Sequence, residues 1–188
     1  MNMRRQTLPV NDVFGRVLSL NSLHPDVARF HLSGESTVGT GTFLVERGNK
    51  LANAVASALH LPRSGHAVSV SIRIDREVGC ERWRRSFDGQ PLETVQRLHR
   101  GNLVEHVGCV GLGLRAVARS SALVVELTRV GLVIGGRYLP FPGRLGLRIR
   151  AQVSAGREPG SVHVVVEISS VLGRLAKYQG ALCMEQRQ

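Results

Sequence analysis

The feature that most constrains the fold is a change of hydrophobic period after residue 65. Apolar side chains at Val68, Val70, Ile72 and Ile74 alternate there with polar ones in the run "HAVSVSIRIDR". A period of two is typical of a strand that buries one face. Gly79 then marks a turn, and "ERWRRSFD" returns as the second arm of a hairpin. The sequence therefore predicts a sheet that covers an apolar interior.

Similar segments occupy most of the chain. Runs rich in β-branched and apolar residues, with turn residues between them, predict further strands. These runs lie at residues 34–47, 92–99, 102–108, 113–119, 122–130, 144–154, 161–169 and 176–184. Together they favour an α+β, β-rich fold. We expect a strongly curved, mostly antiparallel sheet or incomplete barrel of about nine strands, packed on one main helix, with short N-terminal helices.

One segment has a clear helical pattern, "NKLANAVASALHLP". Asn49 can cap the start of this helix, and Pro62 prevents its continuation. The residues that share its predicted apolar face are Leu51, Val55, Ala58 and Leu59. We expect this to be the main helix of the fold.

The N-terminal part has a different pattern. Val13, Val17 and Leu20 recur at helical spacing after Asn11, which can cap a helix, and Pro25 stands where a second helix can begin. We expect an N-terminal helical segment at residues 1–24 and a single β-rich domain at residues 25–188. A length of 188 residues suits one domain with one core.

The chain is strongly basic. Its formal net charge is +11, and Lys50 and Lys177 are its only lysines, so nearly all of the positive charge is arginine. Guanidinium groups bind phosphate and carboxylate well. An arginine excess can equally reflect a genome rich in G and C. We therefore use the net charge as an indication of solubility and nonspecific association, and not as evidence for a particular function.

Nothing in the sequence predicts an export signal or a membrane span. The two N-terminal arginines are followed by no unbroken apolar stretch. Glu126 and Arg129 interrupt the longest apolar region, which falls short of the roughly 20 residues that a span needs. Cys80, Cys109 and Cys183 stand far apart, which fits a reducing compartment. We expect a cytoplasmic protein.

The hairpin arm "ERWRRSFD" places one arginine on its apolar face. Alternation puts Arg82 and Arg84 on the polar side of this strand, and Trp83, Arg85 and Phe87 on the other side. A guanidinium that faces a core must be paired or must meet a ligand, because an unpaired buried charge is strongly unfavourable. The sequence thus singles out Arg85.

Three interpretations of Arg85 stay open. It can form a structural salt bridge to Glu105, which lies between apolar residues in "LVEHVG", or a β-bulge can turn it outward. Alternatively, it lines a cavity and binds the acidic end of a small molecule whose apolar part lies against Trp83 and Phe87. Tyr178 is a further candidate for the same site, because its hydroxyl can face a cavity, although core or rim packing is the commoner role.

Several runs resemble bacterial domain-of-unknown-function family 4166. They are "GTFLVERGNKLANAVASALHLPRSGHAVSVSIRIDRE", "ERWRRSF", "LVEHVG" and "VEISSVLGRLAKYQGAL", within about His31 to Leu182. The matching positions include Gly48, Leu61, Pro62, Gly65, Trp83, Arg85, Phe87, Glu105, Gly173, Tyr178 and Gly180. The resemblance implies no particular activity. It does imply that relatives occur alone or fused to a saccharopine-dehydrogenase-like domain, and we expect no such domain within these 188 residues.

Motifs for other chemistry are missing. The glycines of "GTGTF" and "GCVGLGLR" lack dinucleotide-binding spacing, the seven histidines are scattered, and no Gly-x-Ser-x-Gly elbow occurs. We therefore expect no cofactor, no metal site and no catalytic residues, and favour binding over enzymatic activity.

Three functions follow as hypotheses. The leading one is binding of a small amphiphilic or acidic ligand in a β-cup by Arg85, Trp83, Phe87, Glu105 and Tyr178. The second is an accessory or interaction domain for a dehydrogenase-like partner. The third and least favoured is weak electrostatic binding of nucleic acid, because aromatic residues make up only 4% of the chain and do not alternate with the arginines as stacking platforms do.

Overall fold

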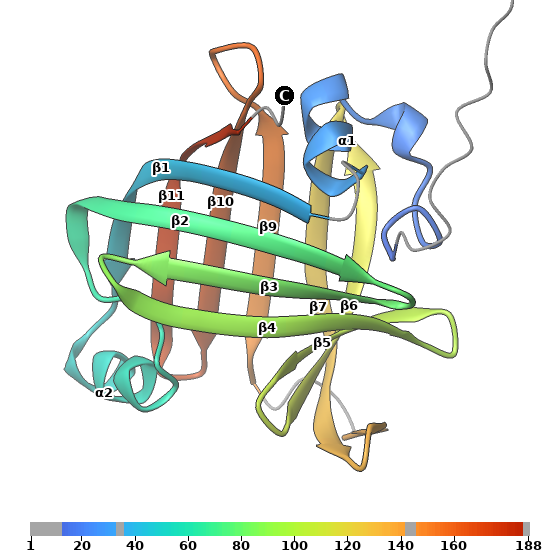
Figure 1. The fold of residues 1–188 in the computed structure, drawn as a ribbon. Helices are drawn as coiled ribbons and strands as arrows, with labels where there is room; N and C mark the ends of the chain where they lie inside the picture. Colours follow the sequence, from blue (N-terminus) through green and yellow to red (C-terminus); the bar gives the residue numbers. More distant parts are fainter. Residues whose placement is uncertain (1–12, 33–35, 142–145, 186–188) are drawn as a thin grey trace, which may run out of the picture.

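The computed structural model describes residues 13–32, 36–141 and 146–185 (Figure 1). Its elements, in chain order, are the 3-10 helix η1 (Leu20–Ser22), α1 (Pro25–Leu32), β1 (Ser36–Arg47), α2 (Lys50–Ala58), β2 (Gly65–Glu77), β3 (Cys80–Phe87), β4 (Gln90–His99), β5 (Asn102–Val107), β6 (Val110–Arg119), β7 (Ala122–Ile134), β8 (Arg137–Pro140), β9 (Arg148–Ala155), β10 (Ser161–Ser170) and β11 (Gly173–Met184).

The strands form a closed antiparallel barrel, where a strongly curved sheet or an incomplete barrel was expected. The sheet runs β6-β5-β4-β3-β2-β1-β11-β10-β9-β7, and pairing of β6 with β7 completes the ring of ten strands. Strands that follow one another in the chain are mostly neighbours in the barrel. The first and last strands also pair, from Gly39 with Met184 to Arg47 with Ala176. Closure leaves none of these ten strands as a sheet edge, which is the physical reason that a meander of this length closes.

The alternation that predicted the β2–β3 hairpin is confirmed. Val68, Val70, Ile72 and Ile74 are all buried. The two strands pair without a register shift from Val70 opposite Phe87 to Glu77 opposite Cys80. Their apolar faces therefore line the inside of the barrel, where the main core lies.

The arginines on the outer face of this hairpin pair with nearby carboxylates. Arg82 lies 2.7 Å from a carboxylate oxygen of Glu93, and Arg73 lies 2.8 Å from one of Asp75. Arg84 pairs with Asp75 and, more loosely, with Glu93. These are solvent-facing strand residues, as alternation predicted, and each exposed pair contributes little to stability.

The short strand β8 was not predicted from the sequence. It pairs with the end of β7 outside the ten-stranded ring. The ring of Tyr138 lies directly over the backbone of the barrel wall, because a Cβ atom at Gly111 or Gly131 would come within 2.6 Å of that ring. Glycine at these two positions is what lets β8 pack so closely.

Helix α2 is present, but its buried face differs from the predicted one. Ala52 and Ala56 are the buried residues, whereas Leu51 is 59% exposed and Leu59 is 48% exposed. The helix lies against the start of β11, with which its alanines form a small second core. Only small side chains fit at this close contact. Asn49 does cap the helix, since its side chain accepts a hydrogen bond from the backbone N–H of Ala52 at 2.9 Å.

The N-terminal segment contributes to the barrel core. Residues 13–17 form turns where a helix was expected, because the two buried residues, Val13 and Phe14, are adjacent and both face the core. The predicted cap Asn11 lies outside the described residues. Helix α1 does begin at Pro25 and buries Val27 and Phe30. The N-terminal helical elements that the structure describes are therefore η1 and α1.

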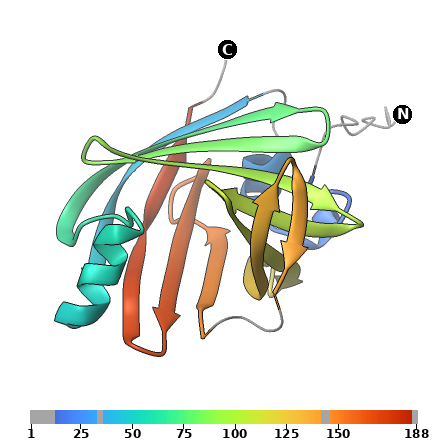
Figure 2. The ribbon, with the colours of Figure 1, turned by 90° about the horizontal axis from the view of Figure 1, so that it is seen from below.

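The two helices lie near opposite ends of the barrel (Figures 1 and 2). Helix α1 contacts β9 and β10, and α2 contacts β11 and β1. Arg47 fixes the segment after α2, because its guanidinium donates to the carbonyl oxygens of Leu61 and Pro62 and to the side chains of Asn53 and Ser57. Helices thus flank an interior that the strands surround. No helix within the described residues is long and apolar enough to cross a membrane.

Candidate functional site

The barrel encloses a cavity of about 290 Å³. Its walls come from most of the strands, with residues before β1 at one end and the end of α2 at the other. Leu59 both lines the cavity and is 48% exposed, which places a solvent-exposed rim beside the C-terminal end of α2. The volume is near the lower limit of small-molecule sites, which span roughly 300 to 1,000 Å³.

Arg85 projects into this cavity from the middle of β3. One terminal nitrogen donates to the hydroxyl of Thr94 at 3.1 Å, and the other lies 3.5 Å from a carboxylate oxygen of Glu105. The guanidinium carbon is 4.9 Å from the centre of a Trp83 ring, which is close enough for a cation–π interaction. Because β3 pairs with both neighbours without a register shift, the bulge that would turn Arg85 outward is not formed.

The salt bridge between Arg85 and Glu105 is therefore present, and it faces the cavity. Both residues line the cavity, and their side chains keep 15% and 17% of their surface exposed. A separation of 3.5 Å is long for a charge-assisted hydrogen bond, which is usually 2.7–2.9 Å. Each group thus has bonding capacity left for a molecule in the cavity.

The other residues predicted for the site also line the cavity. The ring centres of Phe87 and Tyr178 are 5.3 Å apart in an edge-to-face arrangement. Burial raises the pKa of Tyr178, which therefore carries a neutral hydroxyl. Trp83 gives an apolar wall, while its indole N–H donates to Glu81 at 3.1 Å. The structure brings all five predicted residues to one cavity.

Sequence reasoning missed three polar residues of the same cavity, Thr94, Gln96 and His31. Gln96 is 5% exposed, and its side-chain oxygen has no hydrogen-bond partner in the described part of the chain. It lies directly opposite Glu105 in the β4–β5 pairing. Alternation along "LETVQRLH" puts Leu92, Thr94 and Gln96 on one face, so polar residues on an inward face were the available signal.

His31 had no such signal, because it stands at the end of a short helix. It is 1% exposed among the rings of Phe14, Phe30 and Trp83, and neither ring nitrogen has a hydrogen-bond partner within the described ranges. Burial, with a smaller contribution from the nearby positive charge of Arg76, lowers the pKa of His31 to about 3. The imidazole is therefore neutral at physiological pH.

A second buried ion pair supports the α1 end of the cavity. The guanidinium of Arg76 lies 3.8 Å from a carboxylate oxygen of Glu81, and the two side chains are 3% and 0% exposed. Arg76 also donates to the hydroxyl of Thr37 at 2.8 Å and to the carbonyl oxygen of Phe30 at 3.0 Å. Because Phe30 belongs to α1, its hydrogen bond with Arg76 connects β2 to the helix that carries His31.

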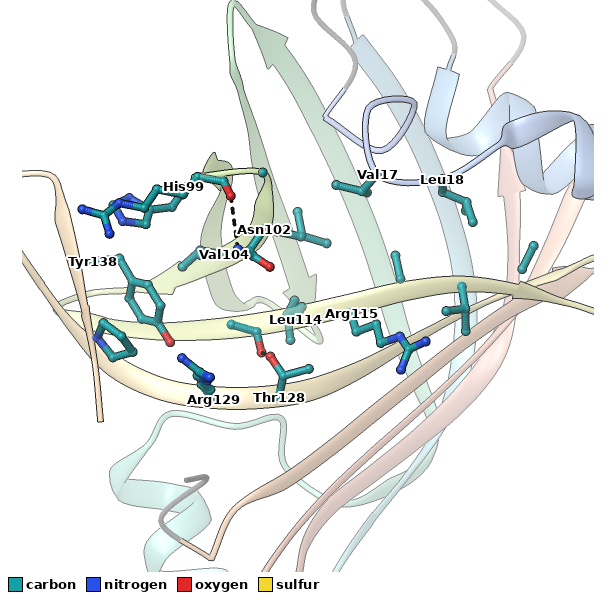
Figure 3. Close-up of a pocket in the computed structure, with 18 of the residues that line it drawn as sticks. Val17, Leu18, His99, Asn102, Val104, Leu114, Arg115, Thr128, Arg129 and Tyr138 are labelled. Atoms are coloured by element: carbon teal, nitrogen blue, oxygen red, sulfur yellow. Dashed lines mark hydrogen bonds between the residues drawn. The ribbon is translucent and has the colours of Figure 1, made fainter. Parts of the chain in front are cut away.

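An open groove of about 1600 Å³ lies on the outer side of the barrel (Figure 3). It is bordered by the N-terminal segment around Val17 and Leu18, the β4–β5 turn, β6, β7 and β8. Its lining includes four arginines and no acidic residue; the arginines are Arg100, Arg115, Arg129 and Arg137. Within the described residues, none of the four forms an ion pair with a carboxylate. The described lining of the groove therefore carries a net positive charge.

Cys80, Cys109 and Cys183 are free thiols. In the part of the chain that the structure describes, no group of three or more histidine, cysteine, aspartate or glutamate side chains is placed to hold a metal ion.

Comparison with known proteins agrees with the sequence resemblance. A family model described as "Domain of unknown function (DUF4166)" matches residues 23–182, which include the complete ring of strands except the last two residues of β11. A search of curated proteins finds no match.

Proposed function

The chain belongs to the DUF4166 family, and we propose that its barrel is a binding protein for a small amphiphilic molecule held in the interior cavity. The observation that carries this proposal is the cluster of polar side chains on an otherwise apolar cavity wall. Arg85, Thr94, Gln96 and Glu105 lie on the neighbouring strands β3, β4 and β5. A barrel of about eight strands is just wide enough to be filled by side chains or to hold one small ligand, and the diameter grows with the number of strands.

The remaining wall suits an apolar chain. Strands β9 and β10 lie across the barrel from β3 and β4 (Figure 1), and they contribute only apolar residues to the cavity: Ile149, Ala151, Val153, Val164, Val166 and Ile168. A ligand with a polar head at Arg85 and an apolar tail against β9 and β10 would match both the polar and the apolar wall of the cavity. The proposal assigns the protein no catalytic step.

Native mass spectrometry of protein purified from a bacterial host tests this function. We expect the wild-type protein to retain a small molecule at one-to-one stoichiometry, and Val166→Trp, which fills the cavity, to lose it. Val165→Trp is the matched control, because residue 165 is next in the strand and does not line the cavity. A wild-type protein that is empty, or a Val166→Trp protein that still carries the molecule, would contradict the proposal.

The outer groove supports a second candidate function, docking of a partner protein through an acidic segment. The lining of the groove combines the four arginines with apolar side chains that include Val104, Leu114 and Leu139. This combination complements a peptide with both carboxylates and apolar side chains. Nucleic acid is a poorer fit, because stacking platforms for bases are few in the groove, where Tyr138 and His99 are the aromatic residues. A dehydrogenase-like enzyme is the first partner to test.

Charge reversal in the groove tests the docking function. We expect a fluorescently labelled peptide of repeating Glu-Leu units to bind the wild-type protein, and Arg115→Glu combined with Arg129→Glu to weaken binding at least tenfold, because attraction becomes repulsion. The matched control is Arg119→Glu combined with Arg148→Glu, two exposed arginines outside the groove. Fluorescence anisotropy at two salt concentrations measures both. Equal losses in the two double variants, or tighter binding of single-stranded DNA, would refute specific docking of an acidic peptide.

A further inference from the structure

The charges inside the cavity restrict the head group of its ligand. Arg85 and Glu105 are the charged residues of the lining, and they form a pair. His31, the other titratable base in the lining, is neutral because of its burial. The described lining therefore has no net charge. A charge brought into such an interior needs an opposite charge, and here each charged side chain already has one.

An anionic head group would meet an unfavourable neighbour. To bind Arg85 it would have to approach the guanidinium that Glu105 contacts at 3.5 Å, which brings two carboxylates close together. A neutral head avoids this repulsion. It can accept a hydrogen bond from Arg85 and still place a donor toward the carboxylate of Glu105.

The unpaired polar atoms favour the same kind of head group. The side-chain oxygen of Gln96, opposite Glu105 on the next strand, can accept a hydrogen bond that no described residue donates. The neutral imidazole of His31 offers one donor and one acceptor. A buried site with these groups selects for a molecule that pairs with them, because each unsatisfied polar atom lowers affinity.

We propose that the cavity is selective for an amphiphile with an uncharged head that both donates and accepts hydrogen bonds, as a primary amide does, in preference to a carboxylate. This inference rests on the proposed binding function. The sequence predicted an amphiphilic or acidic ligand. The charges of the cavity restrict this prediction to uncharged amphiphiles. Glu105 is the residue that sets the selectivity, because its charge offsets that of Arg85.

The test compares three probes with the same apolar tail: decanamide, decanol and decanoate at pH 8. Their binding is measured by calorimetry and by the fluorescence of Trp83, which is the sole tryptophan and lines the cavity. We expect decanamide to bind at least tenfold more tightly than decanoate, with decanol between them because its hydroxyl is a smaller hydrogen-bonding group. Tighter binding of decanoate would overturn the inference while leaving the binding function intact. If none of the three binds, the proposed function fails, and the inference fails with it.

Glu105→Gln provides the sharper result. This variant keeps the size of the side chain but leaves the charge of Arg85 unbalanced, so we expect decanoate to gain at least tenfold in affinity and to overtake decanamide. Glu126→Gln is the matched control, because Glu126 pairs with Arg150 outside the cavity. An unchanged preference in Glu105→Gln, or the same reversal in Glu126→Gln, would show that Glu105 does not set the selectivity. The comparison of probes on the wild-type protein stands even if a variant folds poorly.

Discussion

Arg76→Met is expected to destabilise the protein by about 3 to 5 kcal/mol, because it removes a buried cation that contacts the fully buried carboxylate of Glu81. Glu81 is completely buried, and the guanidinium of Arg76 lies 3.8 Å from its carboxylate. The same substitution removes the hydrogen bonds to Thr37 and to the carbonyl oxygen of Phe30. The loss therefore combines the removal of a buried ion pair with a weakened connection between β2 and α1.

Urea unfolding followed by the fluorescence of Trp83 measures this loss. Arg73→Met is the matched control: it lies on the same strand, but its side chain is 53% exposed and pairs with Asp75 at the surface, so we expect a change of at most about 1 kcal/mol. The double variant Arg76→Met/Glu81→Leu should recover part of the loss, because both members of the buried ion pair are then replaced by apolar side chains. If Arg76→Met is no more destabilising than Arg73→Met, the buried pair is not the stabilising feature that we describe.

Acid is expected to destabilise the folded protein through His31. The folded state holds this imidazole neutral, with a pKa of about 3, whereas the unfolded chain binds a proton near the ordinary value of 6.5. Between these two values the unfolded state binds more protons, so the free energy of unfolding falls as the pH falls. The contribution of His31 to this free energy should decrease by about 2.5 kcal/mol from pH 6 to pH 4.

The measurement is the difference between wild-type protein and His31→Phe, a ring that suits the neighbouring Phe14, Phe30 and Trp83. Urea unfolding is repeated at each pH, and the variant should show a shallower loss of stability below pH 6. His66→Leu, at an exposed position on β2, reports what removal of a surface imidazole does to the same curve. Parallel curves for the wild-type protein and His31→Phe would mean that the folded state accommodates a protonated His31.

Much of the candidate site could be predicted from local alternation. A strand turns successive side chains to opposite faces wherever it lies in a sheet, so the position of Arg85 between Trp83 and Phe87 was enough to place it inside. The same rule placed Glu105 inward on β5, and the two residues do meet. The same alternation puts Thr94 and Gln96 on the face of β4 that carries Leu92. The sequence would have placed both inside the barrel if polar residues had been accepted on an inward face.

The sequence by itself determined the strand-rich fold and which face of each main strand is buried, because these depend on residues a few positions apart. Closure of the barrel depends on contacts between β1 and β11, which are about as far apart in the chain as two strands here can be. The entry of His31 into the cavity and the packing of Tyr138 on Gly111 also join distant segments. Only the tertiary structure decided these features, because a local pattern fixes the direction of a side chain but not the partner that it meets.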